Sequence, residues 1–499
     1  MNSIRRLLRS LTWLFLVSAA ISTVMAQQTP AAPASTPSAA DGVASSWQQI
    51  SIPPLPQWIA AQPRRIELAN GMVIFLQEDH ELPLISGQAT VRGGSRSEPA
   101  NKVGMLDIYG DVWRTGGTSK MTGDQMDDFL EVRAAKLETD DSKESTTITL
   151  DCLKGDFDDV FRLFIELLRD PAFREDKIEL AKNELDTNIA RRNDSSQGIA
   201  DREAAKLIYG KDSPYARSPG FDTVAAVTRD DLLAWFQQHV APNNIIFGMV
   251  GDFNSAEMEK RLRAAFEGWN RGPEAAKPVI PLTPAKPGLY AVDKTDVNQS
   301  QIRFVTLGIE RSNPDYFAVQ VMNQVLSGGF SSRLMADLRT KRGLAYSVGG
   351  GLGAGWDHRG MFWLTIATKS ASTVDAIEGM REDLAKLKAD PPTPDELKFA
   401  KDAILNSFIF RFDTPDKVLH ERMTYEFHGY PLDFLEKFRA GIERVTAADV
   451  NRVVQKYVHP EEFAVLVVGN TGQFGKPLAA LGPVKKIDIS IPPSTAAAR

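Results

Sequence analysis

The sequence contains very little cysteine: Cys152 is the only one among 499 residues. A single thiol cannot form a disulfide within the chain, and it excludes zinc sites that are built from several cysteines. Because Cys152 lies in an apolar stretch with Leu150 and Leu153, we expect it to be buried and not to act as a catalytic thiol.

The chain also lacks a concentrated run of basic residues. Its formal net charge is −6, which argues against a nucleic-acid partner. After residue 26, no segment reaches the roughly 18 consecutive apolar residues that a membrane-spanning helix needs. We therefore expect no nucleic-acid binding and no membrane span after signal cleavage.

Several common catalytic motifs are missing as well. The sequence has no H-E-x-x-H, no G-x-S-x-G and no phosphate-binding P-loop. The glycine-rich segment Gly349–Gly355 is not followed by Lys-Ser/Thr, so we interpret it as a flexible turn at a strand edge. His420 and His428 are two turns apart on one predicted helix face, too far for one metal ion, and the other histidines are scattered.

The first 26 residues have the pattern of a Gram-negative-type export signal. Arg5, Arg6 and Arg9 give a positive start, Leu11–Ala20 is apolar, and compact residues precede a cleavage position before Gln27. An uncleaved membrane anchor is the alternative. We expect a periplasmic or secreted protein.

The rest of the sequence consists of two related halves. Thr228 and Asp231 begin a pattern near the end of the first half, and Thr446 and Asp449 begin the same pattern 218 residues later. A constant offset through matched residues indicates a duplication. The predicted segments are a signal peptide (1–26), a flexible Ala/Pro/Ser-rich spacer (27–54), a first domain (55–270), a Pro-rich linker (271–288), a second domain (289–480) and a tail (481–499).

Each half shows the same order of expected elements. Period-2 runs rich in β-branched residues predict strands, and 3.6-residue spacing after Asp or Thr starts predicts helices, for example over 124–137 and 158–168. Each half closes on an apolar run, residues 244–251 and 463–469, that is typical of a buried strand. The expected fold class is α+β: an antiparallel-rich sheet covered by helices, built twice.

The block LSGGFSSRLMADLRTKRGLAYSVGGGL, residues 326–352, resembles the M16 peptidase family of pitrilysin, insulinase and the mitochondrial processing peptidase. The duplicated halves and a glycine-flanked helical segment that ends in RTGGT share this resemblance, which covers residues 55–480. The resemblance implies a LuxS/MPP-like metallohydrolase fold. It makes the first domain N-terminal-type and the second domain C-terminal-type.

Active members of this family carry an inverted zinc motif, H-x-x-E-H, on a helix of the first half. The resemblance places Asp107 and Asp111 at the two histidine positions and Gly110 at the position of the general base. It places Asn188 at the position of the later glutamate ligand, with Glu184 one helical turn away. The zinc motif is therefore degenerate, and we expect no cofactor in this chain.

The aspartate pair has several possible roles. No His or Glu lies anywhere from Gly104 to Thr118, so a shift of the alignment by one residue restores no ligand. We expect solvated aspartates on a helix whose other face packs through Leu106, Ile108 or Val112. A site for Mg²⁺ or Ca²⁺, which prefer oxygen ligands, is one alternative, and a surviving zinc peptidase is another.

The second half keeps Arg339 and Tyr346, seven residues apart within LRTKRGLAY. The resemblance implies that this pair reaches the substrate beside the zinc. An arginine can hold a peptide carbonyl or carboxylate, and a tyrosine hydroxyl can donate to a developing oxyanion. In the structural alternative, Arg339 caps its helix and Tyr346 packs at the start of a strand.

In the split branch of the family, one chain carries zinc and a second chain carries the Arg/Tyr pair. This sequence is similar to the second chain. The resemblance implies a subunit that is inactive alone and forms a heterodimer with a zinc-bearing paralogue to cleave an extended peptide. The alternatives are a peptide-binding or assembly protein without a peptidase role, and an active peptidase with atypical metal ligands.

Overall fold

The computed structural model describes residues 62–493. The chain divides into two units, residues 1–59 and 60–499, and all described residues belong to the second unit. The expected signal peptide and spacer lie outside the described residues. Among the described helices, none is both long enough and apolar enough to cross a membrane.

The first half forms a six-stranded sheet in the order β1-β2-β6-β3-β5-β4. β2 and β6 run parallel, and the other neighbouring pairs of this sheet are antiparallel. Buried and partly exposed residues alternate along β3, as the period of two in its sequence predicts. The strands are β1 (Arg64–Glu67), β2 (Val73–Glu78), β3 (Leu84–Arg92), β4 (Lys136–Asp141), β5 (Ser145–Leu153) and β6 (Ile245–Gly251).

The second half repeats this sheet. Its order is β10-β12-β8-β13-β7-β14, so that β7-β13-β8-β12-β10 corresponds to β2-β6-β3-β5-β4. The α+β class and the duplicated halves are confirmed. The strands are β7 (Gly288–Asp293), β8 (Gln299–Leu307), β10 (Ser347–Leu352), β12 (Met361–Lys369), β13 (Ala464–Gly469) and β14 (Val484–Lys486), with β9 (Ile309–Glu310) and β11 (Ala354–Gly355) forming a separate short ladder.

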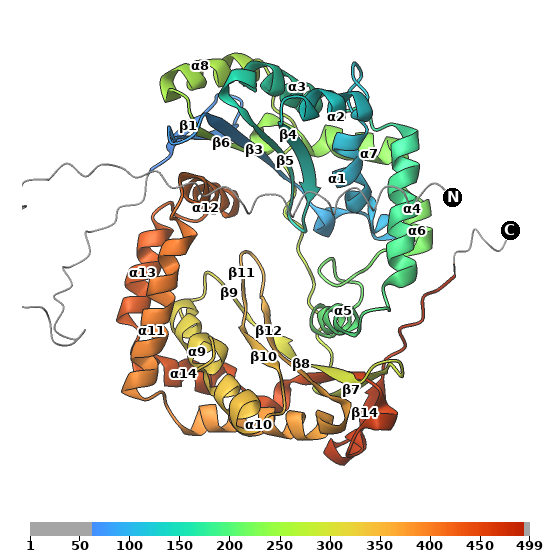
Figure 1. Ribbon diagram of the computed structural model, residues 1–499, viewed down its shortest axis with the longest axis vertical. Coiled ribbons are helices and arrows are strands. Elements are labelled where there is room, and N and C mark those ends of the chain that lie inside the picture. Colours follow the sequence, from blue (N-terminus) through green and yellow to red (C-terminus); the bar gives the residue numbers. More distant parts are fainter. Residues whose placement is uncertain (1–61, 494–499) are drawn as a thin grey trace, which may run out of the picture. The chain divides into compact units, whose positions relative to one another are not determined.

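Helices cover the sheets in both halves (Figure 1). In the first half, buried side chains of α1, α3, α4, α7 and α8 share one apolar core with the sheet. The helices of the first half are α1 (Met105–Thr115), α2 (Gly123–Glu131), α3 (Phe157–Arg169), α4 (Glu175–Arg191), α5 (Ser196–Tyr209), α6 (Phe221–Ala225), α7 (Arg229–His239) and α8 (Ser255–Phe266). Those of the second half are α9 (Tyr316–Ser327), α10 (Thr373–Ala389), α11 (Pro394–Phe408), α12 (Pro415–His428), α13 (Phe434–Arg444) and α14 (Ala447–Tyr457).

The two halves exchange one helix each. α5 packs against β8 and β13 of the second half, and α12 packs against β2 and β6 of the first half (Figure 1). Leu419 and Met423 of α12 join Phe75 and Ile246 in one buried cluster. Gly248 on β6 permits this approach, because a Cβ atom there would lie 2.1 Å from Met423 Sδ. The exchange joins the halves into one body.

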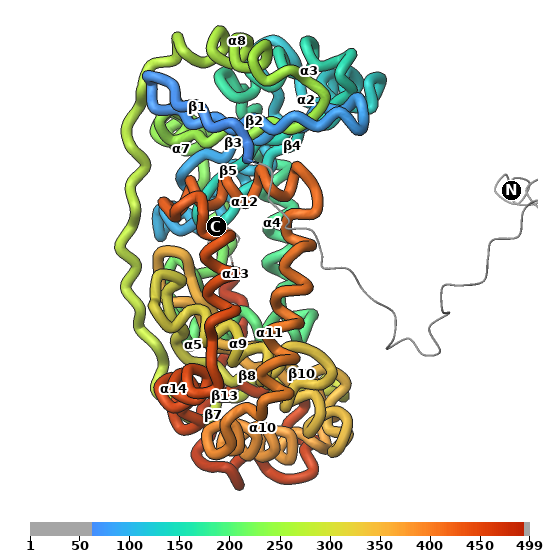
Figure 2. Tube along the Cα trace, turned by 90° about the vertical axis from the view of Figure 1, so that its left-hand side faces the viewer, coloured from blue at the N-terminus to red at the C-terminus, as the bar shows by residue number. Residues whose placement is uncertain are grey.

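The predicted linker connects the halves in an extended form. Residues 271–287, all of them described, form no helix or strand, and the trace runs along one side of the molecule between the halves (Figure 2). Two main-chain hydrogen bonds attach the linker to the end of α5: Ala285 N–H donates to Leu207 O at 2.7 Å, and Thr283 N–H donates to Tyr209 O at 3.3 Å.

Two local predictions were wrong. The helix expected over residues 124–137 is α2, which ends at Glu131, because Ala134 adopts a left-handed conformation with φ of 48° and the chain turns into β4. The glycine-rich segment is mostly a strand, β10, and not a flexible turn. Its glycines allow α9 and β12 to come close: Gly350 has φ of 129°, and a Cβ on Gly351 would lie 2.8 Å from the Asn323 side chain.

Candidate functional site

Helix α1 carries the degenerate zinc-motif positions, and a buried carboxylate holds its N-terminus. Glu98 accepts hydrogen bonds from Gly104 N–H at 3.3 Å and Leu106 N–H at 3.2 Å. Arg217 lies 3.9 Å from the carboxylate of Glu98. Burial nevertheless raises the pKa of Glu98 to about 7. The start of α1 is therefore fixed inside the protein.

One face of α1 is packed and the other is open. Leu106, Ile108 and Val112 are fully buried in the core of the first half, as expected from the sequence. Asp107 and Asp111 are exposed, one helical turn apart. This arrangement agrees with the expected solvated aspartates.

Neighbouring protein groups affect both aspartates. Desolvation raises the pKa of Asp107, and attraction to Lys143 opposes this effect. Desolvation also raises the pKa of Asp111, repulsion from Glu184 on α4 adds to it, and attraction to Lys177 opposes it. For both carboxylates, the attraction to a nearby lysine is too weak to offset the effect of desolvation on the pKa.

The position of the missing general base is occupied by another side chain. Gly110 is buried, and a Cβ atom there would lie 2.9 Å from Asp141 Oδ1 and 3.2 Å from Asp141 Cβ. Asp141 ends strand β4, which is attached to α1 by a hydrogen bond of 2.6 Å from Thr139 Oγ1 to Gly110 O. Desolvation, together with repulsion from Asp107 and Asp140, raises the pKa of Asp141 to about 7. Sequence reasoning missed Asp141, because no motif marks it.

The expected ligand position on α4 does not complete a metal site. Asn188 is exposed on α4, whereas Glu184, one turn earlier, carries the negative charge that repels Asp111. Catalytic zinc in proteins takes about three ligands, mostly imidazole and carboxylate, with an open position for water. The residues around α1 supply no imidazole, and Asp141 fills the space above Gly110. They do not fit the zinc that active relatives carry.

The second candidate site lies in the second half. Arg339 belongs to a π-helical segment, η6 (Met335–Lys341), and Tyr346 directly precedes β10. The guanidinium carbon of Arg339 lies 5.0 Å from the ring centroid of Tyr346 and 4.8 Å from that of Phe330. Tyr346 is 84% exposed and Phe330 is 74% exposed. The structure thus brings Arg339 and Tyr346 together, and it adds Phe330, which sequence reasoning missed.

Arg339 differs from its basic neighbours in its polar contacts. Arg342 is paired with Asp337 and Glu382 at 2.6 Å each, and Arg333 is paired with Glu396 at 2.8 Å. Within the described part of the chain, the side chain of Arg339 makes no hydrogen bond or ion pair. Its guanidinium N–H groups remain available to a ligand.

The two candidate sites are separate in the structure. No hydrogen bond, ion pair or ring contact within residues 62–493 joins Arg339 or Tyr346 to Asp107 or Asp111. The first site lies on α1, α4 and β4, and the second lies between α9 and β10. The roles assigned to these residues remain predictions.

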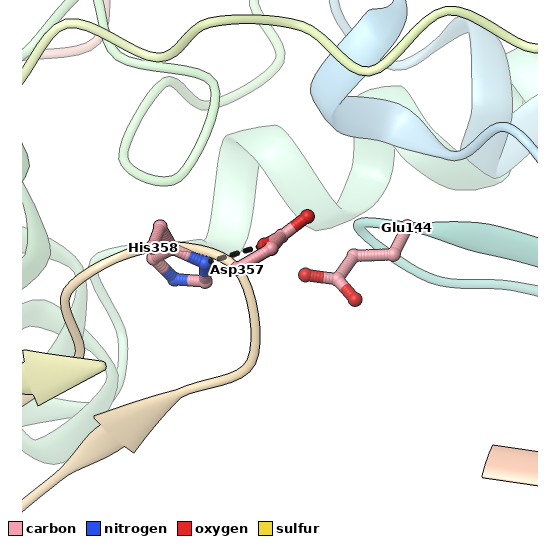
Figure 3. Close-up of side chains that lie close together, drawn as sticks. All are labelled: Glu144, Asp357 and His358. Carbon is pink, nitrogen blue, oxygen red and sulfur yellow. Dashed lines mark hydrogen bonds and ion pairs between the residues drawn. The ribbon is translucent and has the colours of Figure 1, made fainter. Parts of the chain in front are cut away.

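A third cluster of titratable groups joins the halves. Glu144, in the turn between β4 and β5, lies near Asp357 and His358 in the turn between β11 and β12 (Figure 3). These are the one group of the described residues whose carboxylate and imidazole atoms all lie within 4.8 Å of one another. Arg96 lies 2.8 Å from Asp357 and 3.2 Å from Glu144. Because one arginine already pairs with both carboxylates, we interpret the cluster as an ion-pair junction between the halves.

A cavity of about 410 Å³ lies beside this junction. His420 and His428, which the sequence placed on one helix face, both line it from α12. His420 Nε2 lies 2.9 Å from Gln88 Oε1, and the ring of His428 stacks on Trp356 at 4.4 Å. Desolvation lowers the pKa of His428 to about 4, so its imidazole is neutral at pH 7.

Comparison with known proteins agrees with the fold. Residues 74–210 match the family described as Insulinase (Peptidase family M16), and residues 226–404 match the Peptidase M16 inactive domain. The chain is 24% identical to "Non-peptidase homolog YmxG" of Helicobacter pylori over 82% of this chain and 94% of the relative. It is 21% identical to "Uncharacterized zinc protease YmxG" of Bacillus subtilis over 82% of this chain and 98% of the relative.

Solved structures show the same fold. A crystal structure of a peptidase M16 inactive domain from Pseudomonas fluorescens has a TM-score of 0.74 at 24% identity and covers 84% of this chain and 100% of its own. The crystal structure of a protease from Helicobacter pylori has a TM-score of 0.70 at 18% identity, covering 82% and 100%. The duplicated halves, the degenerate zinc motif and these matches lead to one conclusion: the chain belongs to the M16 peptidase family, as a member that lacks the zinc motif.

Proposed function

We propose that this chain is the zinc-less subunit of an exported, two-chain M16-type peptidase. It pairs with a zinc-bearing paralogue in the periplasm or outside the cell, and it contributes Arg339 and Tyr346 to peptide hydrolysis. Zinc held by the paralogue would supply the Lewis-acid chemistry of the hydrolysis. This chain itself carries no cofactor.

The observation that carries the proposal is the state of Arg339. Its guanidinium lies over the rings of both Tyr346 and Phe330, and it has no polar partner within residues 62–493. An arginine fork in this state can donate to a peptide carbonyl or carboxylate. The exposed hydroxyl of Tyr346 can donate to an oxyanion as it develops. The degenerate site on α1 explains why hydrolysis needs a second chain.

The sheets offer a place for an extended peptide. β4 and β10 are edge strands at corresponding ends of the two sheets. β4 contacts α1, and β10 begins one residue after Tyr346. A peptide that adds to such an edge gains main-chain hydrogen bonds, and side chains next to the edge then orient it. This supports a peptide as the ligand.

The test combines the purified full-length chain with the zinc-bearing paralogue and measures cleavage of an unstructured fluorogenic peptide. We expect Arg339→Ala and Tyr346→Phe each to lower kcat/KM of the mixture by about 100-fold, as removal of one oxyanion donor does in other enzymes. Lys341→Ala is the matched control, since Lys341 is an exposed cation on the same segment. This control should cleave like the unmodified chain.

The same experiment separates the alternative functions. Unchanged cleavage by the mixtures with Arg339→Ala and Tyr346→Phe would overturn the catalytic contribution. If the chain then still bound peptide alone, a peptide-binding or assembly role would replace it. Chelator-sensitive hydrolysis by the lone chain would instead indicate an active peptidase with atypical ligands.

A further inference from the structure

Phe330 is a large apolar side chain in an exposed position beside the candidate site. It lies in the connection between α9 and η6, and 74% of it is exposed. The guanidinium carbon of Arg339 lies over its ring at 4.8 Å from the centroid, close to the 5.0 Å that separates the same carbon from the ring centroid of Tyr346. Two exposed aromatic rings therefore share one cation.

The backbone around Phe330 forms a hydrogen-bonded turn. Gly329 has φ of 132°, a conformation that L side chains rarely adopt. Ser332 N–H donates to Gly329 O at 3.0 Å, and Ser332 Oγ donates to the same oxygen at 2.6 Å. Gln324 also donates to Gly328 O. An ordered turn thus holds an apolar ring in solvent at this place.

We propose that Phe330 is a positioning residue that, with Tyr346, orients the guanidinium of Arg339 for the substrate. This inference rests on the proposed function, in which Arg339 binds the peptide. Cation–π attraction to both rings restricts a long side chain that has no ion pair to hold it. These ring contacts use none of the guanidinium N–H groups as hydrogen-bond donors to oxygen, so the N–H groups can still donate to a carbonyl or carboxylate.

The first test needs no partner chain. In the full-length protein, the side-chain protons of Arg339 should show ring-current shifts in an NMR spectrum, assigned by comparison with Arg339→Lys. We expect Phe330→Leu to reduce these shifts and Phe330→Tyr to retain them. If Phe330→Leu leaves the Arg339 shifts unchanged, the inference is wrong, whatever the function of Arg339.

The second test measures coupling in the cleavage assay with the zinc-bearing paralogue. Phe330→Leu should lower kcat/KM by about two- to fivefold, the equivalent of one exposed cation–π contact, and Phe330→Tyr should restore it. In the Arg339→Ala background, Phe330→Leu should have no further effect. A purely structural role would give equal effects in both backgrounds and would overturn the inference.

The outcomes also separate this inference from the proposed function. If Arg339→Ala does not change cleavage, the proposed function fails, and the NMR result alone decides whether Phe330 orients Arg339. If Arg339→Ala lowers cleavage and Phe330→Leu does not, the proposed function stands and the positioning role of Phe330 fails.

Discussion

At the scale of single residues, the space beside Gly110 on α1 is filled by another side chain. Asp141 stands where a side chain at residue 110 would begin. The positions of Asp107, Gly110 and Asp111 could be predicted from the sequence, because they occupy a recognisable motif. The position of Asp141 could not, because it depends on how β4 folds back onto α1.

Asp141 gives a prediction about pH. Its pKa of about 7 lies above the usual 3.8, so between these values the folded chain retains a proton that the unfolded chain releases. The free energy of unfolding therefore falls as pH rises through this range. Above about pH 7, Asp141 lowers it no further. We expect Asp141→Asn to raise the free energy of unfolding by roughly 1–2 kcal/mol at pH 8, with little effect at pH 4.

Urea unfolding at the two pH values measures this difference. Glu138→Gln is the control, because Glu138 is exposed on the same strand, and it should show no comparable pH dependence. If Asp141→Asn raises the free energy of unfolding equally at pH 4 and pH 8, or lowers it at pH 8, then ionisation of Asp141 does not destabilise the folded chain.

At the scale of helices and strands, the exchange of α5 and α12 holds the halves together. The apolar periodicity of the sequence predicts such helices, but it does not say which sheet each one covers. Packing decides which sheet α12 covers, because Gly248 on β6 leaves room for Met423 of α12. The end of α2 and the strand β10 were misjudged for a similar reason: tertiary contacts of Ala134 and Gly350 decide their conformations.

Met423 provides the test of this exchange. It is 4% exposed and packs in the cluster between α12 and the first sheet. Met423→Ala should lower the free energy of unfolding by about 2–4 kcal/mol through lost apolar contact and a cavity. Phe410→Ala, at a position that is 66% exposed in the same half, should change it little. Equal effects of the two substitutions in thermal unfolding would contradict the packing role of α12.

At the scale of the whole described unit, charged groups from distant parts of the sequence meet between the halves. Arg96 joins Glu144 to Asp357. No sequence pattern connects these residues, so the junction could not be predicted, whereas the duplicated fold could be predicted from matched residues at a constant offset. The Arg339–Tyr346 pair was found through its motif, but the ring contact with Phe330 required coordinates.

The junction makes a prediction of its own. Arg96→Met leaves two neighbouring carboxylates without a counter-charge, and we expect a loss of about 1–3 kcal/mol in stability. Adding Glu144→Gln and Asp357→Asn removes the repulsion and should recover part of this loss. Thermal unfolding of the single and triple variants measures both effects. A triple variant less stable than Arg96→Met would contradict the ion-pair interpretation.

The proposed role depends most on one property of the isolated chain, which is the lack of a zinc site. The direct measurement is the zinc content of the purified full-length chain by elemental analysis, together with its hydrolysis of a fluorogenic peptide in the absence of any paralogue. We predict zinc well below one ion per chain and no chelator-sensitive hydrolysis. One tightly bound zinc ion per chain, lost together with activity on chelation, would contradict the account.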